Sequence, residues 1–131
     1  AIDIRLTDAG KSHPMMAGRA DGYAVPCTHR DEVVQLPEGA LLLAGNDHSP
    51  VQAFVIDCDG VDFWGMQYHP EFSPAYVGRY LRGNGRISSE MADDLEAAET
   101  DSAAAMRLST TPQCQSMPVR TTELSNWLAR F

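Results

Sequence analysis

A strand-like segment that ends in His69-Pro70-Glu71 constrains this chain more than any other feature. Residues 64–68 before it are largely apolar, as expected of a strand that enters a core. Side chains two residues apart in an extended chain leave on the same side, so His69 and Glu71 project together and Pro70 points away. Proline lacks an N–H and biases the preceding residue toward extended backbone angles, so we expect sheet pairing to stop here with the imidazole held at the strand end.

An imidazole beside a carboxylate is the arrangement that activates a nucleophile in many hydrolytic enzymes. The carboxylate accepts a hydrogen bond from Nδ1–H, fixes the tautomer and stabilises the imidazolium, while Nε2 stays free to take a proton. We therefore identify His69 and Glu71 as the catalytic candidates. The competing interpretation is a surface turn, which is the usual context of an isolated His-Pro-Glu.

Further motifs extend this pattern along most of the chain. Residues 29–33 (HRDEV), 36–40 (LPEGA) and 48–54 (HSPVQAF) precede the His-Pro-Glu strand, and residues 123–128 (ELSNWL) lie near the end. Together with His69-Pro70-Glu71, these segments resemble the class I glutamine amidotransferases, in particular the free-standing members that are similar to GMP synthase.

The resemblance implies an enzyme in which a Cys–His–Glu triad hydrolyses the amide of L-glutamine to glutamate and ammonia, and the ammonia passes to an acceptor. This chain would supply His69 and Glu71, and Thr28, His29 and Arg30 would line the pocket for the amino-acid end of glutamine. A second interpretation of His29 is a histidine that is hydrogen-bonded at a strand end and orders the following loop. The resemblance also implies that the partner is a synthetase domain or subunit, and it implies no cofactor.

The nucleophile of that triad has no counterpart in this sequence. Family members carry the cysteine on a tight strand-to-helix elbow of the form Gly-x-Cys-x-Gly, upstream of the motifs above. Cys27, Cys58 and Cys114 do not lie in such an element, so we interpret them as ordinary thiols. We therefore expect residues 1–131 to be the C-terminal part of a single amidotransferase domain, whose N-terminal part with the elbow is missing. This chain alone would then be inactive.

The charge and composition exclude several other functions. The formal net charge is −8, and six of the eighteen acidic residues fall between Glu90 and Asp101, so the chain lacks the basic surface of a nucleic-acid-binding protein. No apolar run approaches the roughly 20 residues that cross a bilayer. Three cysteines without paired spacing favour a reducing compartment, from which we infer the cytoplasm. His13 and His48 have no partner at ligand spacing, so we expect no metal site.

The periodicity of the chain predicts an α/β fold. Strands are expected over residues 2–6, 23–27, 40–44 and 51–56, and a turn at residues 57–60 leads into the His69 strand. Combined with the resemblance, this pattern implies the C-terminal portion of a flavodoxin-like class I glutamine amidotransferase domain, with a sheet, a β-hairpin excursion and covering helices.

Residues 8–14 are expected to form a loop or a short helical turn, and the longer helix signals lie after Glu71. Ser73-Pro74 is a typical helix start, and Ser88 or Ser89 is expected to cap a second helix. We expect a loop between Pro112 and Pro118. A final helix is predicted to close the domain against the sheet with an apolar side formed by Leu124, Trp127 and Leu128.

Two other functions fit the same residues. One is a γ-glutamyl hydrolase of the same superfamily, in which the triad cleaves γ-glutamyl amides without passing ammonia onward. The other is a catalytically silent binding or regulatory module that docks onto a synthetase. The sequence does not identify an ammonia acceptor, because acceptor chemistry belongs to a separate domain or subunit.

Overall fold

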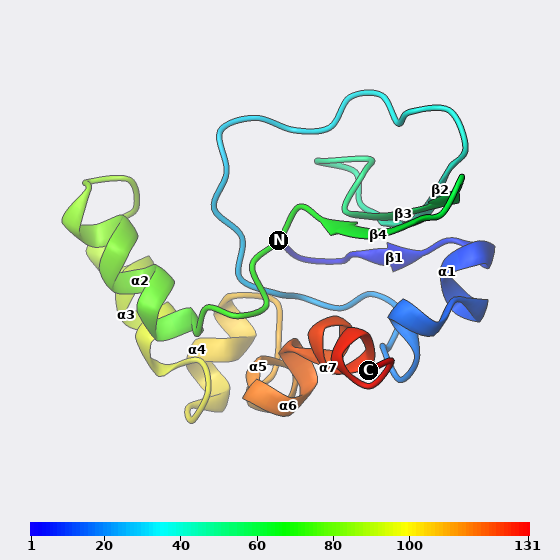
Figure 1. Ribbon diagram of the computed structural model, residues 1–131. Coiled ribbons are helices and arrows are strands. Elements are labelled where there is room, and N and C mark those ends of the chain that lie inside the picture. Colours follow the sequence, from blue (N-terminus) through cyan, green and yellow to red (C-terminus); the bar gives the residue numbers. More distant parts are fainter.

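The computed structural model describes residues 1–131, and its sheet is a four-stranded antiparallel meander in the order β1-β2-β3-β4. Figure 1 shows the sheet on one side of the molecule, with α2 and α3 packed together at one end and α4 to α7 in a row beneath it. The strands are β1 (Arg5–Leu6), β2 (Ala40–Gly45), β3 (Ala53–Cys58) and β4 (Val61–Met66). The expected α/β architecture of a sheet, a hairpin and covering helices is confirmed, and every strand pair is antiparallel.

The helices are short, and most follow the sheet in the chain. Near the N-terminus, Thr7 caps the first helix by accepting a hydrogen bond from the N–H of Gly10. The helical elements are α1 (Asp8–Ser12), the 3₁₀ turn η1 (Pro14–Met16), α2 (Pro74–Gly83), α3 (Ser89–Ala97), α4 (Ser102–Arg107), α5 (Pro112–Gln115), α6 (Met117–Arg120) and α7 (Thr122–Leu128). None of them is long and apolar enough to cross a membrane.

The β3–β4 hairpin sets the position of the His-Pro-Glu segment. Its two connecting residues, Asp59 and Gly60, have φ angles of 51° and 80°. Two left-handed residues in a two-residue loop match the twist of the flanking strands, which is why Asp-Gly is favoured there. The register pairs Cys58 with Val61 and continues to the end of β4, so the turn expected at residues 57–60 is confirmed.

The segment at residues 23–27 is extended, but it does not form the predicted strand. Only Tyr23 pairs as an isolated antiparallel bridge, with Ile4. Beyond it, Val25 and Ala1 exchange two hydrogen bonds of 2.9 and 3.0 Å. Pro26 has no N–H with which to continue a ladder, yet its carbonyl accepts a 2.9 Å hydrogen bond from the N–H of His69. The segment therefore lies beside the His-Pro-Glu turn.

Serine caps begin the two longest helices. Ser73 precedes α2 and accepts a hydrogen bond from the N–H of Tyr76, and Ser88 does the same for α3. The two helices approach closely at Gly78, where an added Cβ would lie 3.0 Å from the carbonyl oxygen of Ala92. Any larger residue at position 78 would push α3 away from α2. The predicted helix starts at these two serines are confirmed.

The predicted loop between Pro112 and Pro118 is wrong. Those residues form α5 and α6, with a proline in the first turn of each helix. Proline suits that position because the first N–H groups of a helix have no intrahelical partner. Thr111 adds a side-chain cap on the N–H of Cys114.

The apolar side predicted for the final helix is also wrong. In α7 the side chains of Trp127 and Leu128 are 43% and 64% exposed, whereas Glu123 is fully buried. The helix packs against η1, and Arg130 just beyond it pairs with Asp62 and lies over the ring of Trp64. The contact of α7 with the protein interior therefore depends on a charged residue.

A buried ion pair joins α7 to the rest of the structure. The Nε of Arg19 donates to Oε1 of Glu123 at 2.8 Å, and a second guanidinium nitrogen donates to Oε2. The side chains are 1% and 0% exposed. Burial acts to lower the pKa of Arg19, but hydrogen bonding to Glu123 and its negative charge outweigh burial and raise it. The core around this pair consists mainly of apolar residues from the sheet and the N-terminal segment, including Ile4, Met15, Leu43, Val55 and Tyr68.

We predict that Glu123→Gln destabilises the fold. The substitution keeps the shape of the side chain but leaves the Arg19 charge buried without a counter-ion, which should lower the free energy of unfolding by about 3–5 kcal/mol. Urea denaturation followed by circular dichroism measures the change. The control is Asp93→Asn, which removes one of the two acidic partners of Arg82 at the exposed surface and should leave the unfolding midpoint nearly unchanged. Equal losses in the two variants would contradict the prediction.

Candidate functional site

His69 and Glu71 are hydrogen-bonded to each other. The Nδ1 of His69 lies 2.8 Å from Oε1 of Glu71. A carboxylate can only accept a hydrogen bond, so this contact places the proton on Nδ1 and leaves Nε2 as the unprotonated nitrogen. The side chains are 37% and 47% exposed, so the pair is open to an approaching group.

The alternation of buried and exposed side chains along residues 68–71 explains this geometry. Tyr68 and Pro70 are fully buried, whereas the side chains between and beyond them face outward. The N–H of His69 is held by the carbonyl of Pro26, and its carbonyl accepts a 3.3 Å hydrogen bond from the N–H of Phe72. Buried neighbours and backbone hydrogen bonds therefore anchor the residue from which the imidazole projects.

The predicted pocket residues meet beside this pair. Thr28, His29 and Arg30 line a cavity of about 440 Å³. The opposite wall comes from α2 and its flanks, and the ring of Phe72 in this wall stacks on the ring of His69 with centroids 5.1 Å apart. The remaining lining residues are Tyr76, Val77, Tyr80 and Arg86.

Two positive charges in this cavity have no acidic partner. Arg30 and Arg86 form no ion pair in the structure, and both are exposed. The cavity can therefore accept an anionic group. His29 lies 2.9 Å through Nδ1 from the carbonyl oxygen of Asp31, so it orders the loop after it and also lines the cavity.

The aromatic wall of the cavity was not predicted as part of a site. Phe72, Tyr76 and Tyr80 follow one another at intervals of four residues, and successive ring centroids are 4.7 and 6.5 Å apart. Residues four apart lie on one face of a helix, so this spacing is the sequence signal that could have identified the row. An apolar helix face has the same spacing, which is why the sequence alone favours a packing role.

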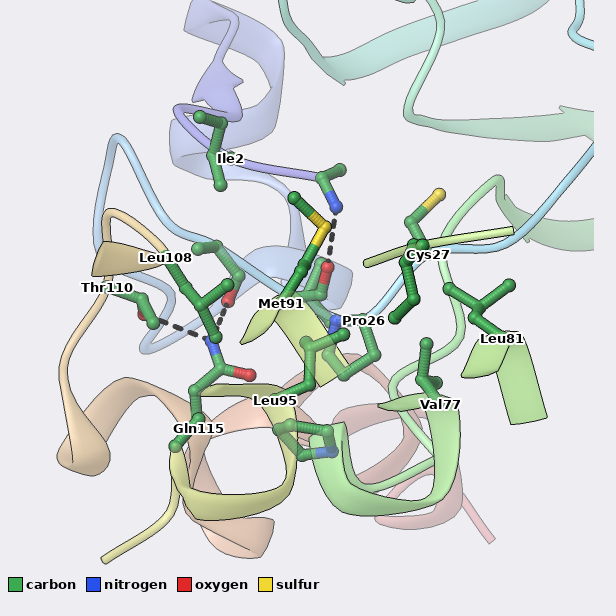
Figure 2. Close-up of a pocket in the computed structure, with 16 residues that line it drawn as sticks. Ile2, Pro26, Cys27, Val77, Leu81, Met91, Leu95, Leu108, Thr110 and Gln115 are labelled. Atoms are coloured by element: carbon green, nitrogen blue, oxygen red, sulfur yellow. Dashed lines mark hydrogen bonds between the residues drawn. The ribbon is translucent and has the colours of Figure 1, made fainter. Parts of the chain in front are cut away.

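A second, apolar hollow of about 220 Å³ lies between the extended segment at residues 24–27 and helices α2 and α3. Figure 2 shows Pro26 and Cys27 on one side of it, facing Val77 and Leu81 of α2. The hydrogen bonds drawn there run from Ala1 to Val25 and from Gln115 to Ala24 and Thr110. The lining contains no acid–base pair, so this hollow offers packing surface and no hydrolytic chemistry.

None of the three cysteines is placed as a nucleophile. Cys27 is half-buried, and the only hydrogen bond of its Sγ is to the carbonyl oxygen of Gln67, at 3.8 Å. Burial raises the pKa of the Cys27 thiol, which opposes formation of the reactive thiolate. Cys58 lies at the exposed end of β3, and Cys114 lies in α5. None of these thiols hydrogen-bonds to His69. No group of three or more His, Cys, Asp and Glu side chains is placed to hold a metal ion.

Comparisons with known proteins find similarity over the first two thirds of the chain. The family model described as glutamine amidotransferase class-I matches residues 2–85. The gamma-glutamyl-L-1-hydroxyisopropylamide hydrolase of a Pseudomonas species is 41% identical over 86 residues, which are 66% of this chain and 29% of the relative.

Glutamine-hydrolysing GMP synthases are also similar. The enzyme of Porphyromonas gingivalis is 37% identical over 70 residues, or 53% of this chain and 13% of the relative. A glutamine-hydrolysing GMP synthase subunit of Methanoculleus marisnigri is 35% identical over 84 residues, or 64% of this chain and 43% of the relative. The matched region thus spans less than half of each of these relatives.

We predict that Cys58 is alkylated by iodoacetamide before Cys27. The reactive species is the thiolate, and the raised pKa of Cys27 shifts thiolate formation to higher pH. The alkylation rate of Cys27 should therefore keep rising when the pH exceeds 9.0, the ordinary pKa of a thiol. Peptide mass spectrometry at timed intervals measures both rates in one sample. Urea-unfolded chain is the control, because both cysteines are then exposed. Faster labelling of Cys27 in the folded chain at neutral pH would contradict this assignment.

Proposed function

The chain belongs to the class-I glutamine amidotransferase family, and from that premise we propose that it supplies the base and the orienting carboxylate of a site that hydrolyses the side-chain amide of glutamine to glutamate and ammonia. The observation that supports this proposal most directly is the 2.8 Å hydrogen bond between Nδ1 of His69 and Oε1 of Glu71. It leaves Nε2 as the nitrogen that takes a proton, on a ring that is open to solvent.

We propose further that the nucleophile comes from a polypeptide segment outside residues 1–131. Within the chain, Cys27 has a raised pKa and the other two thiols lie away from the catalytic pair. A cysteine on a glycine-flanked elbow would complete a Cys–His–Glu triad with His69 and Glu71. In this proposal, residues 1–131 form the C-terminal part of a single amidotransferase domain.

The proposed catalytic cycle uses the imidazole twice. Nε2 of His69 accepts the thiol proton, and the sulfur attacks the side-chain carbonyl carbon of glutamine. The C–N bond breaks as the imidazolium returns its proton to the leaving nitrogen, which releases ammonia and leaves a thioester. Water, deprotonated by the same imidazole, cleaves the thioester to glutamate and regenerates the thiol. Glu71 stabilises the imidazolium in both halves of the cycle.

The 440 Å³ cavity is suited to the amino-acid end of the substrate. Arg30 and Arg86 have no acidic partner in the structure, and a guanidinium pairs well with a carboxylate. The hydroxyl of Thr28 makes no hydrogen bond in the structure and is free to donate. The similarity to a GMP synthase subunit suggests that the ammonia passes to a synthetase domain or to a synthetase subunit.

A second function has specific support. The 41% identical Pseudomonas relative is named as the hydrolase of a γ-glutamyl amide of an organic amine. The same triad chemistry cleaves such an amide, with the amine leaving in place of ammonia. Incubation of the complete domain with glutamine and with γ-glutamyl-isopropylamide separates the two functions. Glutamate release from the isopropylamide but not from glutamine would establish the γ-glutamyl hydrolase and overturn the amidotransferase.

We predict that His69→Ala removes nearly all turnover in the complete domain, whereas Glu71→Gln leaves a larger remnant. Loss of the general base should cost roughly 100- to 10,000-fold in kcat, and loss of the orienting group costs less because the imidazole is still present. A coupled assay of glutamate release measures both. The control is His13→Asn, which removes an imidazole outside the site and keeps an acceptor for the N–H of Met15. Full turnover in the His69→Ala variant would refute the proposed function.

A further inference from the structure

The residue before His69 connects the site to the far end of the chain. The hydroxyl of Tyr68 donates a 2.8 Å hydrogen bond to Oε1 of Glu123 in α7 and accepts a 2.9 Å hydrogen bond from the hydroxyl of Tyr23. All three side chains are buried. We propose that Glu123 is a positioning residue, which acts through the Tyr68 hydroxyl to hold the backbone from which His69 projects.

The backbone at Tyr68 depends on this side-chain contact. Gln67 and His69 each donate a backbone hydrogen bond, to Gln52 and Pro26, but neither the N–H nor the carbonyl of Tyr68 makes one. The hydroxyl is therefore the only group of Tyr68 itself that is hydrogen-bonded, between two neighbours that are held through their backbones. A change in the Tyr68 backbone is transmitted directly to His69, because the two share a peptide plane.

Unlike Tyr68, Tyr23 makes backbone hydrogen bonds of its own, although the hydroxyls of the two tyrosines are bonded to each other. Tyr23 is held through its main chain, which accepts a 2.9 Å hydrogen bond from Ile4 and donates a 3.1 Å hydrogen bond to it. Its hydroxyl only donates to Tyr68. Removal of the Tyr23 hydroxyl thus leaves both its own backbone and the contact of Tyr68 with Glu123 in place.

The ion pair does not require the tyrosine. Arg19 makes hydrogen bonds to both carboxylate oxygens of Glu123, so the charge is compensated without Tyr68. Burial raises the pKa of Tyr68 and of Tyr23 well above the ordinary tyrosine value, so both hydroxyls keep their protons throughout the physiological range. The Tyr68 hydroxyl therefore keeps the proton that it donates to Glu123, and the proposed effect of the contact is on geometry.

The first experiment reads the His69 ring directly, in the isotope-labelled chain of residues 1–131. Nitrogen NMR at pH 8.5 distinguishes a protonated Nδ1 from an unprotonated Nε2, and averaging of the two signals reports loss of the fixed tautomer. The unmodified chain should show two well-separated ring signals. Tyr68→Phe should move them toward each other, and the matched Tyr23→Phe should leave them in place. A similar response in both variants, or none in Tyr68→Phe, would overturn the proposal.

A second variant covers the case in which Tyr68→Phe does not fold. Replacement of both members of the ion pair, Arg19→Met with Glu123→Met, removes the acceptor of the tyrosine without leaving an unpaired buried charge. The ring signals of His69 should again converge, even where urea denaturation shows that stability is retained. Two separate signals in the folded double variant would mean that Glu123 has only a structural role.

For turnover, the inference rests on the proposed function, and the complete domain tests it. A displaced imidazole should lower kcat by roughly 10-fold in Tyr68→Phe with KM unchanged, because the reacting atoms are misaligned while the substrate pocket is intact. Tyr23→Phe should retain full kcat, and an equal kcat in the two variants would overturn the positioning role. Activity in His69→Ala would refute the proposed function by a separate measurement, whatever the ring signals of His69 show.

Discussion

The carboxylate of Glu123 is the contact on which the arrangement of this protein depends. A charge buried without partners would cost several kcal/mol, so the fold requires that this carboxylate be paired and hydrogen-bonded. Arg19 bonds to both oxygens, and two further N–H groups of its guanidinium donate to the carbonyls of Val119 and Arg120 at the end of α6. Hydrogen bonds to Glu123 and to its partner Arg19 consequently join three parts of the fold. These are the N-terminal segment, the C-terminal helices and the His-Pro-Glu strand.

This arrangement presents a hydrogen-bonded imidazole and carboxylate with no thiol bonded to them. The His69–Glu71 hydrogen bond is formed on an open surface, beside a cavity that contains two unpaired guanidinium groups. The stability of the fold does not require an exposed imidazole whose second nitrogen is free, and neither group compensates a buried charge. The pair makes physical sense as part of a larger site, in which an incoming thiol would be deprotonated at Nε2 and shielded from water by the segment that brings it.

Local features could be predicted from the sequence because they depend on a few neighbouring residues. Alternation places His69 and Glu71 together, and serine caps begin α2 and α3. The errors arise where distant partners decide the outcome. The sequence pattern predicts that Glu123 faces solvent, because its buried partner Arg19 is far away in the chain. The apolar side expected for α7 was therefore wrong. Pro26 interrupts the strand expected at residues 23–27, and its carbonyl pairs with His69 instead. The catalytic and pocket roles of the predicted residues are proposals, because geometry alone does not assign a reaction.

The choice between ammonia transfer and simple hydrolysis lies outside the catalytic pair. Both reactions pass through a thioester made with the same base, so His69 and Glu71 cannot distinguish them. The difference is the group on the amide nitrogen and the path by which it leaves. An organic amine needs an apolar surface to contact, and the ring of Phe72, which stacks on the ring of His69, offers one. Ammonia makes no apolar contacts and needs only a route to an acceptor. Under the proposed function, specificity therefore depends on what lies over the ring of Phe72 in the complete domain: an open ring would admit a substituted amide, whereas a covered ring would admit glutamine alone.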